Sequence, residues 1–473
     1  MEQEESVAPP DLPVEIIFLI LEHIQEPDDI RSISLVSSIW RGAAQATIFE
    51  RILVENAHEC EFWCEKFTKH PQLGRYVQDL VLCDRQIDCI EPYLRSVAAK
   101  TLISSLPNVR KLELGSMMQW GPVELQLIKG LCRSLRVLSI DGVVGMDRRR
   151  ALPELLCALP NVEVLTLGQI GEDFPAMDMA PLREDRMVMR KVVPDAGRRT
   201  KLYGLTLIET DTAIDLLLWL TGPAFDLCKL RTLSLLWCPC FDDVSSLEVV
   251  DDFIRTVGKD ITKLTLGIPV SFASAWKLTN DPSRRTYDPN DMLAEHFINT
   301  KILHHFTALE TVTITAGVMG EDEDGKDPST ISSPIFLCHA KFLLQALSHG
   351  ASESLELLAI EVVFDEACPY LTSFSIPPHW IIIDDLLSGD AFPSLRRVEV
   401  TVETRAYHHG GGIPTWYEVA RLIGLSLPKT IKKNKDLLSI WLRPSTEVTV
   451  FPLFSVGQAN AYSTATIELV DSE

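Results

Sequence analysis

The chain has 473 residues, of which 46% are hydrophobic and 23% charged, and its formal net charge is −22. This composition is typical of a folded globular protein and excludes a disordered chain, and the length suffices for several domains or one long repeat array. The negative charge argues against binding to nucleic acids and to anionic membranes, because both present negative phosphates.

The 11 cysteines are an odd number and are scattered through apolar segments. That pattern favours a reducing compartment, in which cysteines act as small core residues. The acidic start, Met1 to Glu5, lacks the basic and apolar regions of a signal peptide. No apolar run reaches the roughly 18–20 residues that span a bilayer. We therefore expect a soluble protein in the cytoplasm or the nucleus, with reduced cysteines, no cofactor and no bound metal.

A polar tail is predicted for residues 1–10, and three short helices are predicted within residues 11–55. The first helix carries Ile16, Ile20 and Ile24 at a spacing of four residues, which places them on one face. Pro27 is expected to end it. The expected caps are Asp11 for the first helix, Asp28 or Asp29 for the second, and Ser37 or Ser38 for the third.

This segment holds more large apolar residues than so small a core can bury. Leu12, Pro13, Ile17, Leu35 and Trp40 cannot all face inward. The surplus predicts either a surface for a permanent partner or a surface that packs on the rest of the chain.

The segment resembles an F-box. The resemblance is carried by Leu12 to Ile17, Asp29 to Ser37, Trp40-Arg41 and Phe49, in that order and spacing. It departs from the family where Ile30 and Ile33 replace leucine and where Ser38-Ile39 precedes Trp40. In the F-box family, three helices dock on the Skp-type adaptor of cullin–RING (SCF) ubiquitin ligases. By resemblance, the adaptor-binding residues are Leu12, Pro13, Ile16, Ile20, Leu35, Val36 and Trp40.

Beyond residue 70 a short motif recurs, with aliphatic residues at its first, fourth and sixth positions. Copies start at Val77, Val109, Leu135, Val162, Leu202, Leu230, Ile261, Leu309, Leu355, Leu395 and Leu437. Seven copies also have a polar or charged residue after the first and before the last aliphatic residue, which is the alternation of a half-buried strand. These begin at Val109, Leu135, Val162, Leu230, Ile261, Leu309 and Leu395.

Helical patterns lie between these copies. They cover 123–131, 149–159, 211–220, 247–257, 336–347 and 417–425. Alternating strands and helices indicate parallel strands with crossover helices. The pattern resembles a degenerate leucine-rich repeat, and the alternative is an ordinary pair of α/β domains.

The predicted fold class is therefore α/β, with an N-terminal three-helix F-box followed by a leucine-rich-repeat-like solenoid of parallel strands and helices. The solenoid is predicted over residues 56–445, with insertions at 171–200, 269–300 and 317–334, and residues 446–473 form a C-terminal tail.

Side chains alternate along a strand, so the residue between the two inward aliphatic residues of each copy faces the opposite side of the sheet. Six consecutive copies carry a hydroxyl there, and these residues are the predicted substrate-binding stripe: Ser139, Thr166, Thr206, Ser234, Thr265 and Thr313. The alternative is that serine and threonine are simply ordinary strand residues on a solvated face.

The sequence contains no complete motif for catalysis. The run from His408 to Gly412 is similar to an esterase oxyanion loop, but the chain has no G-x-S-x-G nucleophile elbow. Cysteines near His58 lack the paired spacing of a zinc site. We expect a chain that is not an enzyme. The expected function is the substrate-recognition subunit of an SCF-type ligase, with a Skp-family adaptor, a cullin and a protein substrate as partners. The alternative is a repeat scaffold that acts outside ubiquitin transfer.

Overall fold

The computed structural model describes the chain in segments. They are residues 12–24, 27–83, 93–115, 120–131, 133–143, 151–168, 199–208, 213–222, 225–236, 244–267, 296–318, 344–345, 347–348, 353–365, 378–405, 424, 426–433 and 438–444. These segments fall in two compact units, one comprising residues 1–147 and 171–173 and the other residues 148–170 and 174–473. We call them unit 1 and unit 2.

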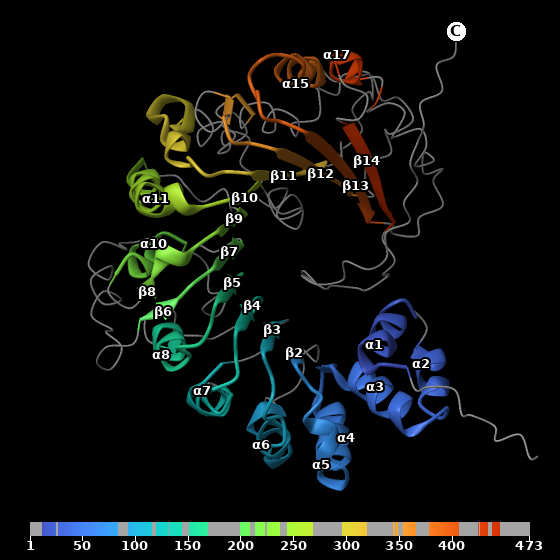
Figure 1. Cartoon of the computed structure of the whole chain (residues 1–473). Coiled ribbons are helices and arrows are strands. Elements are labelled where there is room, and N and C mark those ends of the chain that lie inside the picture. Colours follow the sequence, from blue (N-terminus) through green and yellow to red (C-terminus); the bar gives the residue numbers. More distant parts are fainter. Residues whose placement is uncertain are drawn as a thin grey trace, which may run out of the picture. The chain divides into compact units, whose positions relative to one another are not determined.

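Unit 1 begins with three helices and continues with parallel strands that alternate with helices. Its helices are α1 (Val14–Glu22), α2 (Pro27–Ile33), α3 (Ser38–Phe49), α4 (Ala57–Lys69), α5 (Pro71–Gly74), the 3₁₀ helix η1 (Tyr93–Arg95), α6 (Val97–Ser104) and α7 (Pro122–Lys129). Its strands are β1 (Arg51–Val54), β2 (Asp79–Cys83), β3 (Lys111–Gly115) and β4 (Val137–Ile140), and they lie in that order in the sheet. Figure 1 shows α4, α6 and α7 on one side of these strands.

Unit 2 repeats the same alternation over a longer array. Its helices are α8 (Ala151–Ala158), α10 (Ala213–Leu220), η2 (Leu227–Lys229), α11 (Val244–Val257), η3 (Gly258–Asp260), η5 (Ile302–His305), α15 (Pro378–Ser388) and α17 (Pro428–Lys433). Its main-sheet strands are β5 (Val164–Leu167), β7 (Gly204–Ile208), β9 (Thr232–Leu236), β10 (Lys263–Gly267), β11 (Thr311–Val318), β12 (Leu357–Asp365), β13 (Arg397–Arg405) and β14 (Leu438–Pro444), in that sheet order. A small separate pair joins β6 (Thr200–Lys201) to β8 (Phe225–Asp226).

One hydrogen-bond pattern sets the register from strand to strand. The carbonyl oxygen of Gln78, just before β2, accepts the N–H groups of Arg110 at 2.8 Å and Lys111 at 2.9 Å. In the next step, the Arg110 carbonyl accepts the N–H groups of Arg136 and Val137 at 2.7 and 2.9 Å. The same double acceptance recurs in unit 2 at Glu163, Tyr203, Arg231, Thr262, Glu310 and Glu356. Each repeat is therefore positioned by its predecessor, as in solenoid proteins.

The alternation of buried and half-buried residues in the strands agrees with the prediction from the motif. In β3, Leu112 and Leu114 are fully buried, whereas Lys111 and Glu113 are half-buried. The aliphatic residues of each copy thus form the core between sheet and helices. A mixed α/β fold with a long run of parallel strands is confirmed, and the F-box identity of α1–α3 stays a prediction.

The described residues include a repeat that the motif missed, at β1. Strand β1 pairs with β2 in parallel, and Ile52 lies opposite Leu80. Its copy of the motif starts at Phe49. The motif as defined requires an aliphatic residue at its first position, so an aromatic residue there is not recognised. Phe49 instead packs edge-on against Trp63 and Phe67 of α4.

The last copy of the motif was predicted in the wrong register. Leu438 lies opposite Val398, and Ser439 opposite Glu399. A copy starting at Leu437 would instead have aligned Ile440 with Val398, two residues out of place.

Two of the predicted caps are wrong and one is confirmed. Helix α1 begins at Val14 with Pro13 at its N-cap, so Asp11 does not cap it. Asp28 and Asp29 lie inside the first turn of α2 instead of before it. Ser37 caps α3, and its hydroxyl oxygen accepts the Trp40 N–H at 3.4 Å.

The predicted helices at 123–131, 149–159, 211–220 and 247–257 correspond to α7, α8, α10 and α11. Those at 336–347 and 417–425 fall almost entirely outside the described residues, as do the three insertions and the C-terminal tail. The predicted domain boundaries at 55 and 445 stay predictions.

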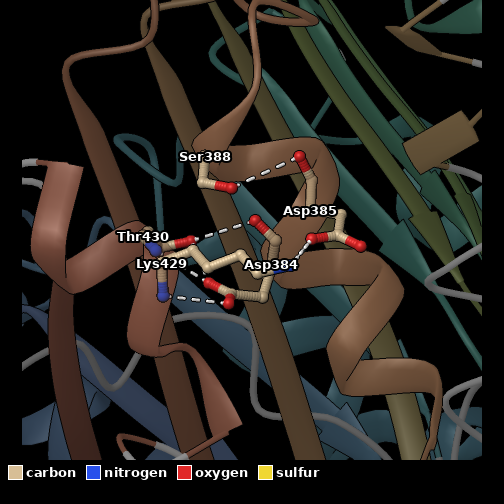
Figure 2. Close-up of polar contacts among 5 residues, drawn as sticks. All are labelled: Asp384, Asp385, Ser388, Lys429 and Thr430. Carbon is tan, nitrogen blue, oxygen red and sulfur yellow. Dashed lines mark hydrogen bonds and ion pairs between the residues drawn. The ribbon is translucent and has the colours of Figure 1, made fainter.

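A buried carboxylate links two helices of unit 2, as Figure 2 shows. Asp384 of α15 is only 2% exposed. Its two oxygens accept the backbone N–H groups of Lys429 at 2.9 Å and Thr430 at 2.7 Å, and the Thr430 hydroxyl at 2.7 Å. Asp384 therefore satisfies the first N–H groups of α17, as an N-cap side chain does, although it lies on a different helix.

We expect Asp384→Ala to lower the free energy of unfolding by about 3 kcal/mol, because it removes a cap and leaves buried donors without acceptors. Urea denaturation of the full chain, followed by circular dichroism, measures the shift. The neighbouring Asp385 is the matched control, because it is exposed and only pairs with the Lys429 ammonium group. Asp385→Ala should leave the curve unchanged; equal shifts for the two variants would contradict the capping role.

Candidate functional site

The core of helices α1–α3 is small. Its buried residues are Ile17, Leu21, Ile30, Ala43 and Ala44, with Ile24, Ile33, Trp40 and Ile48 packed against it. In α1, a helix of nine residues that is apolar at six consecutive positions from Ile16 to Leu21, only Ile17 and Leu21 are buried. A helix that is apolar all round needs burial on more than one side.

The remaining apolar side chains of these helices face solvent. We call them the α1–α3 apolar surface: Leu12, Val14, Ile16, Phe18, Leu19, Ile20, Leu35, Val36 and Ile39. Leu35 and Val36 are the extreme cases, 78% and 69% exposed. Concentrated exposure of this kind on about forty residues marks an interaction site more often than ordinary surface.

Local hydrogen bonds hold the turn that presents Leu35 and Val36. Their backbone N–H groups donate to the carbonyls of Ser32 at 3.1 Å and Ile33 at 3.0 Å. The Arg41 guanidinium donates to the Ser34 carbonyl at 3.4 Å. The Ser37 cap then starts α3 immediately after the turn. The two side chains are therefore fixed in an outward position by a structured turn, which lowers the entropy cost of binding.

The predicted adaptor-binding residues divide into two groups. Leu12, Pro13, Ile16, Ile20, Leu35 and Val36 are all exposed. Trp40 is different, since it is half-buried and packs against the core of the three helices. Their role in binding an adaptor stays a prediction.

Four members of the surface were not predicted: Val14, Phe18, Leu19 and Ile39. The density of apolar residues in α1 was a signal for the first three, because one helix face cannot bury six consecutive apolar residues.

The second predicted site is a row of hydroxyls in unit 2. Strand pairing places five predicted residues side by side in direct register, Thr166 opposite Thr206, then Ser234, Thr265 and Thr313. We call these five the hydroxyl row. Thr166 is 7% exposed and the other four are half-buried. The row continues with Ala359, Glu399 and Ser439.

The five hydroxyls make no hydrogen bond to any residue that the structure describes, in contrast to the neighbouring Thr315, which donates to Glu361 at 3.1 Å. They can both donate and accept, and neutral hydroxyls suit polar or backbone groups better than phosphates.

Ser139, the sixth predicted residue, lies in unit 1. It is half-buried there and is paired with Glu113 on the neighbouring strand. The corresponding face of unit 1 carries charges that pair with one another. Asp79 contacts Lys111 at 3.1 Å and Arg51 at 3.7 Å. Burial raises the pKa of the Glu113 carboxyl, against the opposing effect of Lys111. Ser139 thus belongs to unit 1, and the other five predicted residues belong to unit 2.

No protein-family model matches the chain, and no curated protein matches it. Among solved structures the chain is similar to one in the crystal structure of the yeast Rad7 and Elc1 complex, with 13% sequence identity over 85% of this chain and 97% of that chain. The TM-score is 0.29. So low a score does not establish a shared fold. The evidence for the repeat architecture is the strand register.

Within the described segments, no group of three or more histidine, cysteine or acidic residues is placed to hold a metal ion. Burial raises the pKa of the Cys60 thiol to about 11. Cys60 therefore stays a neutral thiol near pH 7, which suits a core residue and not a nucleophile. The esterase-like run from His408 to Gly412 lies outside the part of the chain that the structure describes. None of the described helices is long and apolar enough to cross a membrane.

Proposed function

We propose that the chain is the substrate-recognition subunit of an SCF-type cullin–RING ubiquitin ligase. In this proposal the α1–α3 apolar surface binds a Skp-type adaptor, and the repeat strands bind the protein substrate. The chain forms and breaks no covalent bond itself. It raises the local concentration of a substrate lysine near the ubiquitin-conjugating enzyme, and acts in the cytoplasm or the nucleus.

The main support for the proposal is that the F-box-like motif contains apolar side chains that are exposed to solvent. Six of the seven residues that the F-box resemblance assigns to the adaptor contact have exposed side chains, led by Leu35 and Val36. The competing possibility was that this surplus packs on the rest of the chain. Within the described residues these side chains remain exposed instead, so a separate partner is the simpler explanation.

The hydroxyl row supports the substrate part of the proposal. Five adjacent strands present hydroxyl groups that make no hydrogen bond to the described part of the chain. The row contains no arginine, so it favours a polar or backbone feature of a substrate over a phosphate group.

We expect Leu12→Ala combined with Pro13→Ala to abolish capture of the adaptor, because both side chains lie at the exposed start of the surface. Affinity purification of the tagged full chain, with mass spectrometry of the bound proteins, measures adaptor and cullin together. The variant should keep the wild-type melting temperature. Undiminished recovery of both partners would refute the assigned contact.

The same purification separates the proposal from its alternative. A repeat scaffold acting outside ubiquitin transfer would recover the adaptor without a cullin, whereas a ligase subunit recovers both in comparable amounts.

A further inference from the structure

Unit 1 carries a basic strip along the edge where its strands begin. The backbone bonds described above place Arg110 beside Gln78 and Arg136 beside Arg110, one residue on each adjacent strand. Neighbouring strands lie about 4.8 Å apart, so the three positions span about 10 Å.

Arg75 lies next to these three positions. The Asn108 side-chain amide donates to the Arg75 carbonyl at 2.7 Å. The two turns also approach each other closely at Gly74, the residue before Arg75. A Cβ added to Gly74 would lie 2.4 Å from the Ser105 carbonyl oxygen. Arg75 is therefore held against the turn that leads to Arg110.

We call Arg75, Arg110, Arg133 and Arg136 the basic edge. All four are exposed. The turns that carry them, residues 72–78, 104–110 and 129–136, contain no aspartate or glutamate. On a chain of net charge −22, a strip of this composition is unusual and concentrates positive potential locally.

Equivalent arginines in unit 2 are neutralised by acids. Arg231 pairs with Asp260 at 3.2 Å, and Arg396 pairs with Glu356 at 3.5 Å. Both occupy the register position of Arg110. In contrast, Arg75 and Arg110 have no ion-pair partner in the described part of the chain. The repeat itself thus does not require an unpaired arginine at this position, and the guanidinium groups of Arg75 and Arg110 are available to a ligand.

We propose that the basic edge binds a short acidic segment of a partner protein. Exposed guanidinium groups bind carboxylates in a bidentate fashion. The strip is about as long as the Debye length of ~8 Å at physiological ionic strength. A long polyanion such as a nucleic acid, or a membrane surface, would extend beyond the strip into the field of the acidic chain. A few clustered carboxylates fit within it. This inference goes beyond the proposed function and does not depend on it.

The test titrates the full chain against a fluorescent peptide of about four glutamates, which spans roughly 13 Å when extended, and follows fluorescence anisotropy at low and at physiological salt. Arg75→Gln combined with Arg110→Gln should weaken binding about tenfold, which corresponds to two exposed charge pairs. Binding by the wild type should weaken with salt more steeply than binding by the variant.

Arg231→Gln combined with Arg396→Gln is the matched control, because it removes two arginines from the same register position in unit 2. The control should bind the peptide as the wild type does. Equal losses in the two double variants, or no binding by the wild type, would overturn the proposal. So would equally tight binding of a single-stranded oligonucleotide of similar length, which would reassign the edge to nucleic acid.

Discussion

Replacing Leu35 and Val36 together by aspartate should weaken binding of the Skp-type adaptor by at least about 100-fold. Two exposed aliphatic side chains contribute roughly 1.5–3 kcal/mol each when an interface buries them, and a buried unpaired carboxylate adds a further penalty. The two residues are 78% and 69% exposed in the chain alone, so folding should tolerate the change. Isothermal titration of the purified chain with the adaptor measures the loss.

Two other exposed aliphatic residues provide the matched control. Val97 of α6 and Ile381 of α15 are 83% and 54% exposed and lie outside the α1–α3 apolar surface. Changing them to aspartate should leave adaptor affinity unchanged. If the Leu35/Val36 variant remained folded and bound the adaptor as the wild type does, the docking surface would be wrong.

Replacing Thr206, Ser234 and Thr265 together by phenylalanine should abolish substrate capture while adaptor binding persists. The three residues are adjacent in the hydroxyl row, so large side chains there remove hydrogen-bonding groups and fill the space above three strands. Proximity labelling in cells treated with a proteasome inhibitor identifies substrates as proteins that the wild-type chain labels. The triple variant should lose at least about 90% of that labelling, as expected for a change of more than 1.4 kcal/mol in affinity.

Thr101, Thr256 and Thr300 make a suitable control trio, since they are exposed hydroxyl residues on helices. Their change to phenylalanine should leave labelling intact. Labelling that survives in the row variant would place substrate binding elsewhere on the chain.

Much of the strand order was predictable because the motif specifies which residues face the core. An aliphatic residue at the fourth and sixth positions fixes the inward face of each strand, and a shift by one residue would expose both. The two errors have physical causes. Phe49 fills the first position of the β1 repeat with an aromatic ring, and Leu437 offers an apolar residue two positions away from the true register.

Features that depend on distant residues were not predictable. The Asp384 cap joins residues 46 positions apart, and no local pattern indicates it. The basic edge likewise depends on the stacking of one turn on the next, which holds Arg75 against the turn that leads to Arg110. For the α1–α3 apolar surface, the surplus of apolar residues was visible, but which of them remained exposed required the packing of α1 against α3.

Size-exclusion chromatography with light scattering, applied to the purified full chain mixed with a purified Skp-type adaptor, tests the central claim most directly. We predict a stable one-to-one complex in which the α1–α3 apolar surface becomes protected from hydrogen exchange, whereas the hydroxyl row does not. A chain that elutes separately from an adaptor that binds a known F-box protein in the same buffer would contradict it.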